Sequence, residues 1–145
     1  MIESARKAIL NSSESSSVYI GCDSLVYTKK GKNLVKYSVV IILHLDSKHG
    51  GRIFHETKEF PNYGNLKQRL LKETEIAIDT VLEIIDVIGN RKLSVHLDLN
   101  ASPEHKSNIA VREALGWVKG ATGIDAQIKP GAWAASNAAD YVVRK

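Results

Sequence analysis

The hexapeptide YIGCDS, at Tyr19–Ser24, ends an apolar run with a carboxylate. Aspartate is a poor strand former, and burying it without a partner costs free energy. Because side chains alternate along a strand, Gly21 and Asp23 share one face while Cys22 lies on the other. Asp23 is therefore either a turn residue at the end of a strand or one of several polar groups that meet there.

The composition is typical of one ordinary globular domain. The 145 residues are 43% hydrophobic and 25% charged, and a single domain over 1–145 is predicted. No apolar run reaches the ~18 to 20 residues of a membrane span, and the start of the sequence lacks a signal-peptide pattern. One cysteine excludes an intrachain disulfide, so a cytoplasmic location is expected. The net charge of +4 permits a polyanionic partner without requiring one.

Hydrophobic periodicity predicts an α/β fold. Alternating or β-branched runs predict strands at 18–23, 34–45, 52–60, 92–100 and 124–129. Three- and four-residue apolar spacing predicts helices at 65–88, 103–119 and 132–145, after a short helix at 1–10. The order βββαβαβα predicts a five-stranded mixed sheet, in which three antiparallel strands are followed by parallel strands and helices flank the sheet.

Four acidic residues on four of these elements are predicted to meet. Asp23 ends the first strand, and Asp98 lies near the end of the fourth. At ~100° per residue, Glu73 falls on the buried stripe of the long helix, whereas Glu75 points to solvent unless the helix is shifted. Asp140 borders the inward stripe of the last helix, whose small residues would allow it to approach the sheet closely.

Clustered carboxylates favour a cation. Without one they repel each other, and oxygen ligands suit hard divalent ions, so Mg²⁺ or Mn²⁺ is the expected cofactor. Two such ions about 3.5 to 4 Å apart can activate water and stabilise the leaving oxygen in phosphodiester cleavage. The small Gly21 leaves space beside Asp23, which predicts a ligand or metal close to the backbone.

Each acid also has an ordinary structural explanation. Asp23 could form a turn at the end of its strand, and Asp98 could cap the loop before the next helix. Glu73 could be a boundary residue that reaches solvent, and Asp140 could be solvated near a helix end. The case for a site depends on the joint pattern. His96, on the same face as Asp98, is interpreted as filling the sheet.

The order of elements and the positions of the acids resemble the ribonuclease H-like superfamily. Within it, YIGCDS, HLDLN, KSNIAVREALGWVKG and KPGAWAASNAAD resemble the YkuK-type family of bacteria and phages, whose function is largely unassigned. QRLLKET is a weaker match. The resemblance covers the first strand and most of the chain after residue 90.

The resemblance implies catalytic and metal-binding roles for Asp23, Glu73, Asp98 and Asp140. The family-like Asn100, Lys106, Ser107 and Asn108 would line a substrate groove or order the loop beside Asp98. The sequence lacks the basic, Trp-bearing insertion by which some ribonucleases H grip hybrids, so a preference for hybrids is not implied strongly.

The expected function is metal-dependent hydrolysis of nucleic-acid phosphodiesters, with RNA or an RNA/DNA hybrid as the favoured substrate. Lys106 or the basic end Arg144–Lys145 would contact the nucleic-acid backbone. The alternative is a non-catalytic module that binds nucleic acid, a nucleotide or a protein. Holliday-junction resolution also occurs on this fold, but it requires a dimer for which the sequence defines no interface. Endonuclease and exonuclease action, and bacterial and phage origin, are equally compatible with the sequence.

Overall fold

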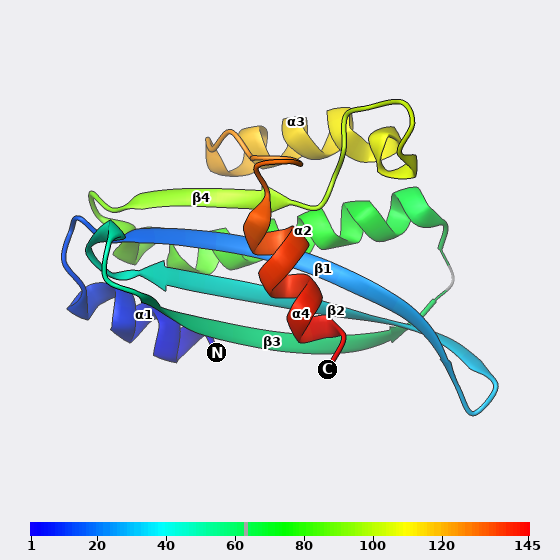
Figure 1. Ribbon diagram of the computed structural model, residues 1–145, viewed down its shortest axis with the longest axis horizontal. Helices are drawn as coiled ribbons and strands as arrows, with labels where there is room; N and C mark the ends of the chain where they lie inside the picture. Colours follow the sequence, from blue (N-terminus) through cyan, green and yellow to red (C-terminus); the bar gives the residue numbers. More distant parts are fainter. Residues whose placement is uncertain (63) are drawn as a thin grey trace.

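Four strands form one mixed sheet at the centre of the computed structural model, which describes residues 1–62 and 64–145. The strand order is β3-β2-β1-β4 (Figure 1). Strands β1 (Ser17–Lys29), β2 (Lys32–His44) and β3 (Gly51–Pro61) form an antiparallel meander, and β4 (Lys92–Leu97) runs parallel to β1. The predicted meander followed by a parallel strand is confirmed.

The first strand is longer than predicted. It continues past Asp23 to Lys29 and turns into β2 through Lys30 and Gly31, whose φ angles of 52° and 76° are those of a tight hairpin. Its far half alternates between half-buried and exposed residues, and the alternation of LVYTK followed by a glycine turn was the signal for this extension. Asp23 therefore lies near the middle of β1, paired with Ser38 of β2.

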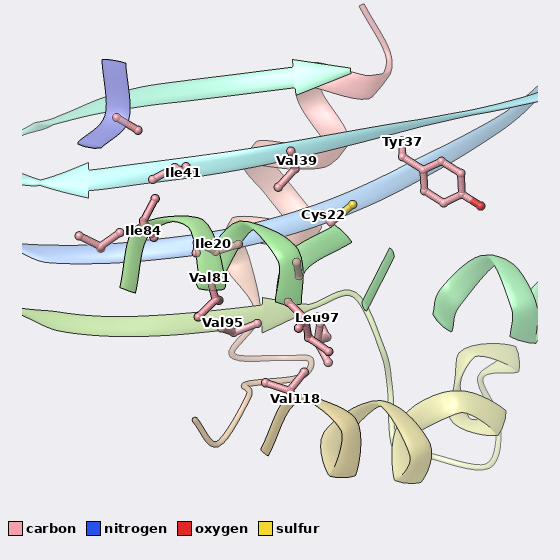
Figure 2. Packing of buried hydrophobic residues seen from close by; sticks show 14 of the residues in the cluster. Ile20, Cys22, Tyr37, Val39, Ile41, Val81, Ile84, Val95, Leu97 and Val118 are labelled. Atoms are coloured by element: carbon pink, nitrogen blue, oxygen red, sulfur yellow. The ribbon is translucent and has the colours of Figure 1, made fainter. Parts of the chain in front are cut away.

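One face of the sheet is covered by α1 (Ile2–Asn11) and α2 (Leu66–Ile88). A capping box fixes the start of α2, because the Asn65 side chain accepts from the Gln68 N–H while the Gln68 side chain accepts from the Asn65 N–H. The core lies between α2 and the sheet. Figure 2 shows it as apolar side chains from both layers, among them Ile20, Cys22, Val39, Ile41, Val81, Ile84, Val95 and Leu97.

The opposite face is crossed by the C-terminal segment, which comprises π-helical η3 (Ala134–Ala139) and α4 (Asp140–Val143) and lies over β1 and β2 (Figure 1). A Cβ added to Gly21 would lie 2.5 Å from backbone atoms of Ala134 and Ala135. Gly21 therefore serves the close approach of this segment. The expectation that the space beside Gly21 admits a ligand or metal is wrong, because the helical backbone fills it.

The predicted fifth strand at 124–129 is not a strand, and the sheet of the described residues has four strands rather than five. The segment lies beside β4 with a single bridge, His96 to Gln127. Gln127 exchanges two backbone hydrogen bonds of 2.8 Å with β4, and Lys129 donates one more to Leu99. Pro130 follows at once and has no N–H, so the ladder cannot continue.

The predicted second helix begins later than expected. A 3₁₀ turn, η2 (Lys106–Ala110), precedes α3 (Val111–Thr122), which packs against α2 and extends past the predicted end at residue 119. The last predicted helix, 132–145, is divided into η3 and α4. No helix among the described residues combines the length and the hydropathy needed to cross a membrane.

Candidate functional site

Three aspartates from distant parts of the chain lie near one another where the C-terminal segment crosses the sheet. Asp23 is 7% exposed on β1, and Asp140 of α4 is close enough to share a hydrogen bond with it. Asp98 follows the end of β4 by one residue, and its charge acts on Asp23. The structure therefore brings together three of the four acids expected from the sequence, from strands that are neighbours and a helix that crosses them.

The environment of Asp23 disfavours its charged form. Burial raises its pKa to about 8, and the hydrogen bond with Asp140 and the charge of Asp98 act in the same direction. The N–H of Ser24 donates to Asp23 Oδ1 at 2.9 Å and opposes this shift in part. Asp23 is thus largely protonated at neutral pH, since two further carboxyl groups are held beside it in a partly buried place.

The fourth acid, Glu73, reaches the cluster from the α2 side of the sheet. It is 5% exposed, and its carboxylate accepts a hydrogen bond of 2.5 Å from Ser24 Oγ. Burial raises the pKa of Glu73 well above its usual range, and the charge of Asp23 adds to the effect. Glu75 instead pairs with Lys72 at 3.1 Å near the surface. Of the two helix acids, Glu73 is the buried one, and it lies near enough for the charges of Asp23 and Asp98 to raise its pKa.

Basic side chains neutralise part of the cluster. Lys129 Nζ lies 2.8 Å from Asp98 Oδ1, and Arg144 Nε donates to Asp140 Oδ1 at 2.7 Å. The hydrogen bond with Asp98 raises the pKa of Lys129. Ser136 Oγ donates to the same Asp98 oxygen at 3.2 Å. Residues 1–62 and 64–145 contain no three His, Cys, Asp or Glu side chains placed to hold a metal ion.

His96 joins β4 to the helical segment that carries Asp140. Its Nδ1 accepts a hydrogen bond of 3.0 Å from the Ala134 N–H, so the proton of the neutral ring lies on Nε2. Burial lowers the pKa of His96 to about 4, and the charge of Lys92 contributes. The ring packs between Tyr19 and Trp133, with centroid distances of 5.4 and 5.2 Å. His96 fills the sheet, as interpreted from the sequence, and also anchors the segment above it.

The four residues expected to line a substrate groove are distributed around the loop after β4. Ser107 Oγ accepts from the Asn100 N–H, and Asn100 Oδ1 accepts from the Ser102 N–H, both at 2.9 Å. Lys106 is exposed and Asn108 is half-buried. Asn100 and Ser107 therefore order the loop beside Asp98, which was the second of the two alternatives.

Sequence reasoning missed several residues of the site. Lys129 begins the family-like segment KPGAWAASNAAD but was given no role there, and Arg69 lies close enough to Glu73 to lower its pKa. Ser24 belongs to the hexapeptide itself. Its side chain points away from Asp23 because strand neighbours alternate, and it thereby contacts Glu73 on the other face. Asp23 and Ser24 are thus adjacent residues of β1 that contribute to the site from opposite faces of the sheet.

The pKa of Asp23 predicts how stability changes with pH. Its folded pKa of about 8 exceeds its unfolded value, so between these values the folded chain binds more protons and the free energy of unfolding falls as pH rises. Glu73 acts in the same direction, whereas the lowered pKa of His96 matters only below its unfolded value. We expect a loss of roughly 2 kcal/mol between about pH 6.5 and 8.

Urea unfolding in the presence of a chelator would measure this loss. In the Asp23→Asn variant the decline should be much smaller, because the amide cannot titrate. An equal decline in the variant and the original chain would show that Asp23 does not cause it.

The family model described as Ribonuclease H-like matches residues 1–144. The chain therefore belongs to the ribonuclease H-like family, which suggests a nuclease-type or nucleic-acid-related function. Comparison with curated proteins and with solved structures gave no match.

Proposed function

We propose that this protein is a divalent-metal-dependent nuclease of the YkuK type, with RNA or an RNA/DNA hybrid as its favoured substrate. Its site would consist of Asp23, Glu73, Asp98 and Asp140. The observation that carries the proposal is the proximity of carboxyl groups from four distant parts of the chain, of which Asp23 and Glu73 are buried, with the pKa of Asp23 raised to about 8. A chain gains nothing in stability from such an arrangement, which indicates that the acids are retained for chemistry.

The donor set fits a hard divalent cation. All its ligands are carboxylate oxygens, as Mg²⁺ and Mn²⁺ prefer, and a bound cation would offset the burial and the neighbouring carboxyl groups that raise the pKa of Asp23. Two of the aspartates already have basic partners: Lys129 pairs with Asp98 and Arg144 pairs with Asp140. The side chains of Lys129 and Arg144 are 41% and 62% exposed. Because water reaches both side chains, they would release Asp98 and Asp140 to a metal ion at a small cost in free energy. A bound ion would supply activation of water and stabilisation of the leaving oxygen.

The remaining residues would hold and position the site. Ser24 orients Glu73 through a hydrogen bond and the charge of Arg69 favours its ionised form, while His96 fixes the segment that carries Asp140. Asp23 must lose its proton before it can act as a ligand. Lys129, released from Asp98, would lie at the rim of the site, where an ammonium group can pair with a backbone phosphate.

Other exposed cations would extend this contact along the nucleic acid. Lys106 and the basic end Arg144–Lys145 are exposed and are the candidates expected from the sequence. Their contribution would be independent of base sequence and would weaken as salt concentration rises.

Substituting the two helix acids tests the site at the residue level. We expect Glu73→Gln to reduce Mn²⁺-dependent cleavage at least about tenfold, because the amide carries no charge to share with a metal. Glu75→Gln is the matched control on the same helix, and its cleavage rate should stay within about twofold of the original chain. The assay compares single-stranded RNA, DNA and the hybrid with Mn²⁺, with Mg²⁺ and with a chelator.

Full activity of purified Glu73→Gln would remove this residue from the site. Equal losses in both variants would indicate an indirect effect through the helix rather than a role for Glu73.

One observation favours the non-catalytic alternative. Lys129 and Arg144 pair with Asp98 and Asp140, and the described part of the chain holds no three His, Cys, Asp or Glu side chains placed around a metal ion, as a module that binds nucleic acid without cutting it could also show. The same assay distinguishes the two functions. A binding module would retain nucleic acid on a filter or in a gel shift, without cleaving any substrate of the panel at any Mn²⁺ concentration.

A further inference from the structure

Strand β3 presents a long, exposed edge. It is paired only with β2 among the described residues and lies at the rim of the sheet in Figure 1. From Gly51 to Pro61 every residue is exposed except the half-buried Phe54. Backbone groups at such an edge are a template for pairing with another strand.

The direction of the free backbone groups follows from the ladder. The N–H of Asn62, just after β3, donates to the C=O of Asn33 in β2. Because hydrogen-bonded residues alternate along an antiparallel pair, the even-numbered residues of β3 point their N–H and C=O groups toward β2. The odd-numbered residues therefore point theirs outward. Only Pro61, at the end, lacks the donor.

We propose that this protein forms a two-fold symmetric dimer in which the β3 edges of two copies pair antiparallel, with Thr57 opposite Thr57. In this register Glu56 lies opposite Lys58 of the second copy, and His55 lies opposite Glu59. Phe54 lies opposite Phe60, a residue that is 37% exposed in the single chain. The two odd-numbered pairs, Thr57 with Thr57 and His55 with Glu59, are then the ones that exchange outward backbone hydrogen bonds.

The charges select this register over its neighbours. An axis one residue earlier sets Glu56 against Glu56, and one residue later sets Lys58 against Lys58. An axis at His55 sets Lys58 against Arg52, and one at Glu59 sets Glu59 against itself. Opposite charges directly across an antiparallel pair stabilise it, and like charges destabilise it. Of these five registers, only the one at Thr57 sets an acid directly opposite a lysine, at Glu56 and Lys58, without opposing like charges.

The direction of the two-fold axis determines how the faces of the two sheets are oriented in the dimer. An axis perpendicular to the sheet keeps its faces, so the two four-stranded sheets become one continuous sheet with both C-terminal segments on the same side. Both carboxylate clusters would then open toward that side. The dimer itself does not depend on what the clusters do.

Charge reversal tests the register without disturbing the fold, since Glu56 and Lys58 are both exposed. By sedimentation equilibrium, we expect a dimer of the original chain and at least about a tenfold rise in dissociation constant for either Glu56→Lys or Lys58→Glu. Mixing these two variants restores complementary charges at both pairs. The mixture should therefore dimerise about as tightly as the original chain, as should the variant carrying both substitutions.

Lys48→Glu, an exposed reversal in the turn between β2 and β3, is the matched control and should leave the dissociation constant unchanged. A chain that stays monomeric up to millimolar concentration would overturn the proposal. So would a dimer that either reversal leaves intact, or a mixture of the two variants that fails to associate. Circular dichroism of each variant shows that a loss of dimer is not a loss of fold.

Discussion

The variant Gly21→Ala is expected to lose about 3 kcal/mol of its free energy of unfolding and to undock the C-terminal segment from the sheet. An added Cβ would lie 2.5 Å from the backbone of Ala134 and Ala135. Backbone atoms cannot rotate away as a side chain can, so either the segment or the strand must move. Because the segment carries Asp140, we also expect a loss of any activity that needs this residue.

Urea unfolding measures the stability change, and hydrogen exchange over residues 132–143 measures the docking. Gly116→Ala is the matched control, because Gly116 lies within α3 and an added Cβ there meets nothing within 4 Å. Alanine should stabilise that helix by about 0.5 to 1 kcal/mol. If Gly21→Ala were as stable as this control, the close approach of the segment would be wrong.

The pair of variants Asp23→Asn and Asp98→Asn is expected to weaken Mn²⁺ binding by more than about a hundredfold each. Changing only an outer partner of a metal ligand costs ~10 to 100-fold, and these are proposed as the ligands themselves. Calorimetry of the original chain should also show release of about one proton per ion at neutral pH. The reason is that Asp23, with its pKa near 8, must deprotonate to bind.

Asp23→Asn should retain its fold. The side chain is buried and largely protonated at neutral pH, so a neutral amide of the same shape resembles its resting state. We expect this variant to be at least as stable as the original chain at about pH 8. Asp125→Asn, at an exposed acid paired with Lys119, is the control that should bind Mn²⁺ unchanged.

The parts of the site that were predictable are those set by local periodicity. Strand alternation placed Gly21 and Asp23 on one face, and the helical period distinguished Glu73 from Glu75. Topology then brought Asp98 beside Asp23, because β1 and β4 are parallel neighbours. Each of these inferences needs only a few consecutive residues and the order of the elements.

What was not predictable depends on three-dimensional contacts. The pairing of Lys129 with Asp98 joins residues from two segments whose approach no period encodes. The segment 124–129 has the composition of a strand, yet only one residue of it bridges β4 before Pro130. The role of Gly21 was misread for the same reason: a missing side chain in a sequence indicates space, and only the structure shows that Ala134 and Ala135 fill it.

The most direct test of the account is hydrolysis of labelled RNA, DNA and hybrid by the purified chain as a function of Mn²⁺ concentration, beside the double variant Asp23→Asn/Asp98→Asn. We predict cleavage of at least one substrate that rises and saturates with Mn²⁺, is abolished by a chelator, and is absent in the double variant. Undiminished cleavage by the double variant, or no cleavage of any substrate by the original chain at millimolar Mn²⁺, would contradict a metal-dependent nuclease site at these carboxylates.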